Sequence, residues 1–190
     1  MPEPSLSIII PTCGRETLGR TITSIREQLS TYEDEIIVVG DGVQLVARGI
    51  LSLPDWRFHY FEHGPTNHYG NEQRDFGMDK ATGDFLWFVD DDDIIAPGAL
   101  NTIHTELSLA PSVPHMFSMQ IGDTVYTGAN GSQGGPMLIT PNDKNKLSRW
   151  SGNVYCVDQH FCSKINEHYG SFSVHHEIIY IGDKYNRGQP

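Results

Sequence analysis

The chain has 190 residues, of which 38% are hydrophobic and 19% charged, and its formal net charge is −11 at pH 7. These values are typical of a soluble globular protein with one hydrophobic core, so we expect a single domain over residues 1–190. The acidic balance argues against a surface for nonspecific nucleic-acid binding. No apolar run is long enough to span a bilayer, so we expect no transmembrane segment, and the N-terminus lacks the pattern of a signal peptide. Cys13, Cys156 and Cys162 have no familiar metal spacing, which favours a reduced, cytoplasmic setting.

Strands and helices are expected to alternate through the first half of the chain. The apolar run at residues 6–10 is stopped by Pro11, and the apolar positions of residues 18–29 have the spacing of one helix face. The expected order is strand 6–10, helix 18–29, strand 35–39, a weaker helix 43–53, a strand near 58–60, helix 71–80, strand 85–89 and a helix that starts at Pro97. This alternation predicts an α/β fold with a mostly parallel central sheet.

The second half of the chain has a different pattern. The expected elements are strands at residues 115–121 and 124–127, a glycine-rich loop at 128–135, a short helix at 157–167 and a final strand at 171–181. We therefore expect two parts within the one domain. The first part, about residues 1–110, would bind a nucleotide. The second part, about residues 111–190, would bind a second substrate.

Four consecutive aspartates, Asp90 to Asp93, follow directly on the apolar run 85–89. The apolar run predicts a buried strand of a parallel sheet, and ligands of open α/β sheets bind at the carboxyl ends of strands. Adjacent carboxylates repel one another unless a cation or hydrogen-bond donors neutralise them. A Mg²⁺-type ion shared with substrate phosphates would meet this need. The alternative is that one aspartate caps the next helix and the others are solvated.

Four segments carry a resemblance to a known family. In chain order they are residues 6–12 (LSIIIPT), residues 35–42 (EIIVVGDG), residues 74–77 (RDFG) with 81–85 (ATGDF), and residues 88–93 (FVDDDD) with Pro97 and Leu100 after them. Together they resemble, in order and spacing, the motifs of family 2 glycosyltransferases. The resemblance implies a GT-A fold with helices on both faces of the sheet. It also implies a nucleotide-diphosphate sugar donor, UDP-linked by default, and Mn²⁺ or Mg²⁺ as cofactor.

The resemblance also implies roles for individual residues of the donor site. Asp41 would accept a hydrogen bond from the donor's base, and Asp91 would face the ribose or the sugar. Arg74 would lie near the nucleotide or its phosphates, which its forked, permanently charged guanidinium suits. The alternatives are a turn residue for Asp41 and, for Arg74, a surface salt bridge to Asp75 or Glu72.

The metal is assigned by the same resemblance. Asp92, the last residue of the Asp90-x-Asp92 motif, would bind it, and the metal would offset charge on the leaving diphosphate. Asp90, Pro11 and Thr12 complete the implied donor site. His176, on the final strand, is a candidate additional metal ligand.

An inverting transfer needs a general base that takes the proton of the acceptor hydroxyl. In the family this base is the aspartate of a Glu-Asp motif at the start of a late helix. Asp158 occupies a comparable place, with Val157 where the family has glutamate, and it becomes the candidate base. Helix capping is the alternative role for Asp158, while His160 and Glu177 are the alternative bases.

Some residues depart from the family pattern or allow two interpretations. Cys13 stands where the family has an aromatic residue able to stack on the donor's nucleotide base, and we expect Cys13 to be a small buried residue. Gly40 replaces the first aspartate of the usual pair, so the identity of the donor's nucleotide base is open. Trp87 is expected in the core, whereas Trp150 would either stack on an acceptor or pack at the surface. The loop 128–135 would be either a lid or a mobile connection.

The sequence therefore predicts a metal-dependent, inverting glycosyltransferase. It would move a sugar from a nucleotide-diphosphate sugar to a hydroxyl of a glycan, a lipid-linked or another acceptor. Two alternatives stay open at this point. One is a catalytically silent module that binds nucleotide sugars, and the other is a nucleotidyltransferase.

Overall fold

The computed structural model describes residues 3–29, 33–42, 56–66, 68–128, 133–150 and 157–182. Its elements, in chain order, are β1 (Leu6–Thr12), α1 (Leu18–Arg26), β2 (Glu35–Gly40), β3 (Phe58–Glu62), α2 (Asn71–Lys80), β4 (Phe85–Phe88), β5 (Ile94–Ile95), α3 (Ala99–Leu109), β6 (His115–Ile121), β7 (Thr124–Tyr126), the short 3₁₀ helix Gly135–Met137, β8 (Leu138–Pro141), α4 (Val157–Tyr169) and β9 (Ser173–Gly182). The expected helix 43–53 lies outside the described residues.

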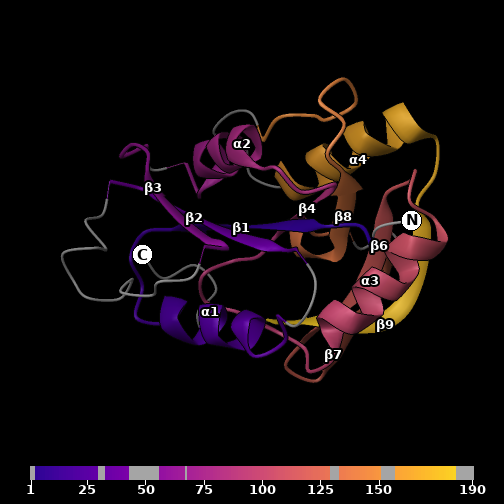
Figure 1. Cartoon of the computed structure of the whole chain (residues 1–190), viewed down its shortest axis with the longest axis horizontal. Helices are drawn as coiled ribbons and strands as arrows, with labels where there is room; N and C mark the ends of the chain where they lie inside the picture. Colours follow the sequence, from indigo (N-terminus) through magenta and orange to yellow (C-terminus); the bar gives the residue numbers. More distant parts are fainter. Residues whose placement is uncertain are drawn as a thin grey trace.

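The nine strands of the described residues form one sheet, in the order β3-β2-β1-β4-β8-β6-β9-β5, with β7 paired to β6. The first four strands in this order are parallel to one another. Strand β8 is antiparallel to both β4 and β6, whereas β9 is parallel to β6 and antiparallel to β5. The parallel part of the sheet comes from the first half of the chain and the mixed part mainly from the second (Figure 1).

Helices cover both faces of the sheet, because the buried strands are apolar on both sides. In β1, Ile8 and Ile10 belong to the cluster that contains the buried faces of α1 and α3. Ile9, between them, belongs to the cluster that contains residues of α2 and α4. Figure 1 shows α2 and α4 above the sheet and α1 and α3 below it. The fold class expected from the sequence is confirmed.

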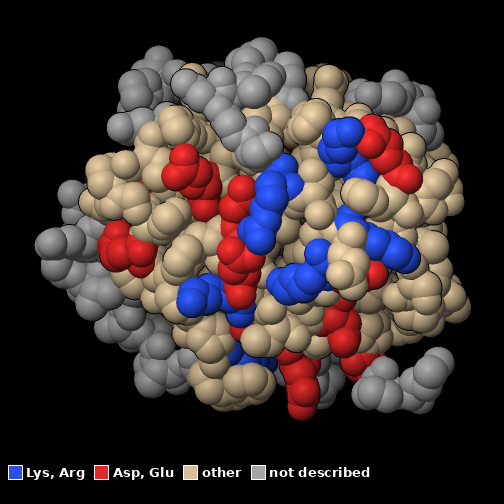
Figure 2. Space-filling model, turned by 90° about the horizontal axis from the view of Figure 1, so that it is seen from above, with Lys and Arg blue, Asp and Glu red and all other residues tan. Residues whose placement is uncertain are grey.

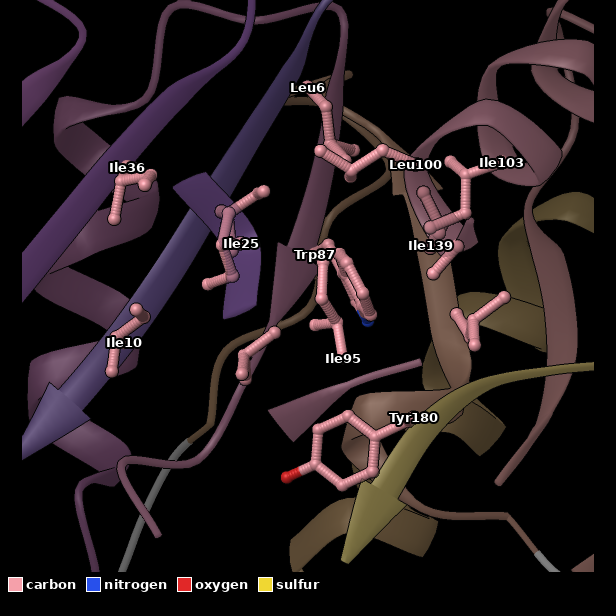
Figure 3. Close-up of a cluster of buried hydrophobic side chains, with 14 of the residues drawn as sticks. Leu6, Ile10, Ile25, Ile36, Trp87, Ile95, Leu100, Ile103, Ile139 and Tyr180 are labelled. Atoms are coloured by element: carbon pink, nitrogen blue, oxygen red, sulfur yellow. The ribbon is translucent and has the colours of Figure 1, made fainter. Parts of the chain in front are cut away.

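The cluster on the α1 and α3 side is drawn in Figure 3. Trp87 of β4 lies inside it with no exposed surface, as expected, and its indole N–H donates to the carbonyl of Pro136 at 2.8 Å. Tyr180 of β9 contributes its ring to the same cluster, while its hydroxyl is directed toward the acidic segment after β4. The core thereby continues to the edge of the sheet where the aspartates lie.

Some expected boundaries differ from the structure, and two short strands were not expected. Strand β1 continues through Pro11 to Thr12, because the pairing with β4 ends at Ile9 and Phe88 and the missing N–H of Pro11 leaves no bond unmade there. Helix α3 begins at Ala99, after Gly98 in a left-handed conformation with φ 79°. Strands β5 and β8 were not expected from the sequence, since they have two and four residues and no clear alternation.

Candidate active site

The candidate site lies where β2, β1 and β4 end side by side. Since these strands are parallel, their carboxyl ends meet at one edge of the sheet. The main-chain N–H of Asp41, after β2, donates to the carbonyl of Thr12 at the end of β1 at 2.8 Å. The Thr12 hydroxyl donates to Asp91 Oδ2, after β4, at 2.6 Å. Three of the predicted residues are thus brought together by the topology of the sheet.

Asp91 and Asp92 share one cation. Nη1 of Arg15 lies 3.0 Å from Asp91 Oδ1 and 2.8 Å from Asp92 Oδ2. Burial raises the pKa of both carboxyl groups, and the charge of Arg15 opposes that rise in each. The Arg20 guanidinium donates to the main-chain carbonyl of Asp92 at 2.7 Å and helps to hold the turn.

Asp90 is held by Arg74 of α2. The distance from Arg74 Nη2 to Asp90 Oδ1 is 2.5 Å, and the side chain of Arg74 is only 10% exposed against 37% for Asp90. Nη1 of Arg74 donates to the carbonyl of Tyr69 at 2.9 Å, and the guanidinium lies over the ring of Trp150. Arg74 is therefore a buried residue of the site, and the alternative of a surface salt bridge to Asp75 or Glu72 is wrong.

Asp93 points toward the core instead of the open edge. Its Oδ2 accepts a hydrogen bond of 2.5 Å from the buried hydroxyl of Tyr180, and its carbonyl accepts one of 2.6 Å from Thr21. Burial raises the pKa of the Tyr180 phenol, and the nearby charges of Asp90 and Asp93 add to this effect. None of the four aspartates caps α3, whose N-cap is Gly98. Asp93 fixes the turn, and the first three aspartates face the site.

Asp41 is bound to the segment between β3 and α2. Its Oδ1 accepts from the N–H of Thr66 at 2.6 Å and from Nε2 of Gln73 at 2.7 Å. A Cβ on Gly64 would lie 2.8 Å from the same oxygen, so the loop packs closely around the carboxylate. The contacts explain how Asp41 is oriented at the end of β2. Its expected role as the ligand of the donor's base stays a prediction.

Asp158 lies in the first turn of α4, and its Oδ2 accepts from the main-chain N–H of Gly135 at 3.1 Å. A Cβ on Gly135 would lie 2.6 Å from the Trp150 ring, so the end of the glycine-rich segment packs directly on that ring. Because Trp150 also contacts Arg74, a continuous set of contacts leads from Asp158 to the donor side. The expectation of Trp150 as a surface or acceptor-stacking residue is wrong, since 1% of its area is exposed.

His176, the candidate additional metal ligand, is exposed on β9. It lies where the pairing of β6 and β9 is irregular, between Val174 and Ile178. The contact between β9 and the aspartates is made four residues further on, by Tyr180. The structure therefore does not bring His176 to Asp92. The alternative bases His160 and Glu177 are also exposed.

Arg15 was the main residue of the site that sequence reasoning missed. It follows Cys13 and Gly14 after β1, and its position at the carboxyl end of a parallel strand was the available signal. Cys13 itself is exposed, which corrects the expectation of a buried residue. It lies beyond the last residue of β1, where the sheet no longer covers the chain.

The oxygen donors suit a divalent metal that is shared with a substrate. Within the described residues, no group of three or more His, Cys, Asp and Glu side chains could hold a metal ion. A Mg²⁺-type ion needs only one or two carboxylates when phosphate and water oxygens complete its shell. Asp92 and the partly exposed Asp90 can supply these. The residues therefore fit a metal that binds together with a diphosphate.

Two further features concern the surface and the helices. On the face drawn in Figure 2, acidic and basic side chains are interleaved, and the described residues form no continuous basic area there. Among the helices of the described residues, none combines the length and the apolar character needed to cross a membrane.

The sequence matches a protein family and individual relatives. The model of the family described as "Glycosyl transferase family 2" matches residues 7–162. A GalNAc(5)-diNAcBac-PP-undecaprenol beta-1,3-glucosyltransferase of Campylobacter jejuni is 36% identical over 105 residues, which are 53% of this chain and 33% of that protein. An uncharacterized glycosyltransferase of Haemophilus influenzae is 29% identical over 163 residues, which are 83% of this chain and 61% of that protein. The chain thus matches less than two thirds of the length of either relative.

Solved structures share the fold at low sequence identity. Residues 1–349 of S. aureus TarS in complex with UDP-GlcNAc give a TM-score of 0.78 at 19% identity, over 97% of this chain and 60% of that one. The mannosyltransferase PcManGT of Pyrobaculum calidifontis, in complex with GDP-Man and Mn²⁺, gives a TM-score of 0.72 at 19% identity, over 98% and 59%. These likenesses confirm the GT-A fold that the sequence predicts.

Proposed function

We propose that this chain, which belongs to glycosyltransferase family 2, catalyses a metal-dependent, inverting transfer of a sugar from a nucleotide-diphosphate sugar to a hydroxyl acceptor. One observation carries the proposal most directly. The carboxylates of Asp90 to Asp92 converge with Arg74 and Thr12 at the carboxyl edge of the parallel strands. Such an edge is where open α/β sheets bind nucleotides.

The donor site would be formed by the first half of the domain, residues of about 1–110. Asp41 would accept an N–H of the base, and Asp91, beside Pro11 and Thr12, would face the ribose or sugar. The proposal of a nucleotide sugar is supported by TarS, whose structure is a complex with UDP-GlcNAc, and by PcManGT, in complex with GDP-Man. Since these two donors carry different bases, a UDP-sugar is the first donor to test and the base stays open.

The metal would be held by Asp92, with Asp90 beside it. When bound, Mn²⁺ or Mg²⁺ would offset the negative charge that develops on the leaving diphosphate. Arg74 would contribute a fixed positive charge on the same side, because its guanidinium is buried and held by the carbonyl of Tyr69. The Mn²⁺ in the PcManGT complex supports this cofactor for the fold.

The second half of the domain, residues of about 111–190, would hold the acceptor. The acceptor oxygen would form a bond to the anomeric carbon while the bond from that carbon to the diphosphate oxygen breaks. The hydroxyl proton would pass to the carboxylate of Asp158, and the nucleoside diphosphate would leave with the electron pair. The name of the Campylobacter relative makes a lipid-linked glycan the first acceptor class to test. A cytoplasmic location stays a prediction from the sequence.

The test begins with donor binding. Thermal shift with UDP-, GDP-, TDP- and CDP-sugars, with and without Mn²⁺, would compare the wild type with Asp92→Ala. Asp123→Ala, an exposed carboxylate in the turn between β6 and β7, is the matched control. We expect a shift with one nucleotide that needs metal, is lost in Asp92→Ala and is kept in Asp123→Ala.

Release of nucleoside diphosphate with candidate acceptors then separates the enzyme from its alternatives. Metal-linked donor binding without transfer to any acceptor would favour a silent binding module. Absence of a metal-linked shift with every donor would contradict the proposal.

A further inference from the structure

One guanidinium nitrogen lies between two carboxylates of the acidic segment. Nη1 of Arg15 is 3.0 Å from Asp91 and 2.8 Å from Asp92, while Asp90 has Arg74 as its own partner. Two arginines from different parts of the chain thus partner the three aspartates that face the site. The positive charge nearest to the expected metal ligand is that of Arg15.

The carboxylate of Asp92 is already occupied in this arrangement. Its Oδ2 accepts from Arg15, and the main-chain N–H of Asp92 also donates to its carboxyl group. A divalent cation that coordinates Asp92 would come within a few ångströms of the guanidinium. Two positive charges at such a distance repel each other strongly in a partly buried site. Metal binding and the contact between Arg15 and Asp92 therefore compete.

The two arginines differ in how firmly they are held. The Arg74 side chain is 10% exposed and is fixed by Tyr69 and Trp150. The Arg15 side chain is 35% exposed and lies in the segment between β1 and α1, next to Gly14 with φ 86°. Because Arg15 is more exposed than Arg74, moving its guanidinium away from Asp92 costs less than moving that of Arg74 would.

We propose that Arg15 is an internal counter-cation that a divalent metal displaces from Asp92, so that Arg15 sets the metal affinity of the donor site. The inference rests on the proposed metal-dependent function. In the metal-free protein Arg15 prevents repulsion between Asp91 and Asp92 and keeps both side chains in place. It also weakens the binding of metal alone, which makes the diphosphate of the donor necessary for tight metal binding.

Titration of the purified protein with Mn²⁺ alone, followed by the electron paramagnetic resonance signal of free Mn²⁺, tests the proposal. We expect Arg15→Gln to bind Mn²⁺ about tenfold more tightly than the wild type, since the competing cation is gone. Arg15→Lys keeps the charge but not the fork, so its affinity should lie between the two. Arg20→Gln is the matched control, because Arg20 contacts Asp92 through its main-chain carbonyl.

Equal or weaker Mn²⁺ binding by Arg15→Gln would overturn the proposal. So would an equal gain in Arg20→Gln, which would indicate a general effect of net charge. Circular dichroism checks that each variant is folded. If Arg15→Gln is not folded, the Mn²⁺ affinity of Arg15→Lys decides the question. Sugar transfer by the wild type is measured separately. If transfer occurs while Mn²⁺ affinity is unchanged in the variants, this inference fails and the proposed function stands.

Discussion

The guanidinium carbon of Arg74 lies 4.9 Å from the centre of the Trp150 ring. Trp150 in turn stacks on Phe161 of α4, with ring centres 4.4 Å apart and planes 13° from parallel. Its main-chain N–H donates to Asp75 of α2 at 2.8 Å, which fixes the ring against that helix. One buried indole therefore joins the arginine that holds Asp90 to the helix that carries the candidate base.

Replacement of Trp150 by an aliphatic residue should lower both donor affinity and stability. Trp150→Leu removes the aromatic face below Arg74, and cation–π contacts of this kind contribute about 1 kcal/mol. We expect donor affinity to fall about fivefold and the free energy of unfolding to fall by about 2–4 kcal/mol. Trp150→Phe keeps an aromatic face and should restore most of the donor affinity. Donor titration and urea unfolding measure the two effects.

A core variant on the other face of the sheet provides the control for Trp150. Phe117 is fully buried there, so Phe117→Leu should lower stability while donor affinity below the melting temperature is unchanged. If Phe117→Leu weakens donor binding as much as Trp150→Leu does, Trp150 has no specific effect on Arg74.

Arg74→Lys should weaken donor binding although the charge is kept. The lysine ammonium cannot bond to the Tyr69 carbonyl and to Asp90 in the same forked geometry. We expect the donor dissociation constant to rise about tenfold, with a smaller change in the rate at saturating donor. Steady-state kinetics with varied donor would measure both. An unchanged Michaelis constant would mean that Arg74 only supports the fold.

Asp158→Asn tests the base directly, because asparagine keeps the shape and can still accept from the N–H of Gly135. We expect turnover to fall by about 100-fold or more with donor binding intact. His160→Gln and Glu177→Gln, which change the exposed alternative bases, should keep turnover within about threefold of the wild type. A larger loss in either of these variants, with Asp158→Asn active, would move the base to that residue.

The parts of the site that the sequence predicted are those set by local pattern. The apolar run before Asp90 indicated a buried parallel strand, and the end of such a strand is a ligand site in this class of sheet. The burial of Trp150 could not be predicted in this way. It depends on packing against Arg74, which is remote in the sequence, and against Phe161 of the following helix, while the residues next to Trp150 in the sequence are polar. A neighbouring polar segment was a misleading guide to burial.

The short strands and Arg15 were missed for a related reason. Strand β5 has two residues and exists because β9 pairs with it, so it has no periodicity of its own. Arg15 faces the aspartates because β4 ends beside β1 in the sheet. Which strands are neighbours in the sheet could not be read from the sequence pattern. The sequence therefore predicted which strand end is acidic but not which cation faces it.

Two histidine rings stack on each other on the α3 side of the sheet. His115 of β6 and His175 of β9 lie with Nδ1 and Nε2 3.0 Å apart, and Nε2 of His115 faces the carbonyl of Ala110 at 2.9 Å. A carbonyl only accepts, so Nε2 of His115 carries the proton and its Nδ1 accepts from His175 when both rings are neutral. If both rings were protonated, two N–H groups would point at each other.

Burial lowers the pKa of both rings, and the charge of Glu106 only partly opposes this for His175. Because the folded pKa values lie below those of the unfolded chain, about 6.5, the unfolded state binds more protons as pH falls. Stability should therefore be full near pH 8 and should decrease as pH falls through about 6.5 toward the folded pKa values. His115→Gln cannot be protonated, so its urea midpoint should change less between pH 8 and pH 5 than that of the wild type. His168→Gln, an exposed histidine of α4, should keep the wild-type pH dependence. Parallel curves for the wild type and His115→Gln would show that the buried pair does not cause the acid sensitivity.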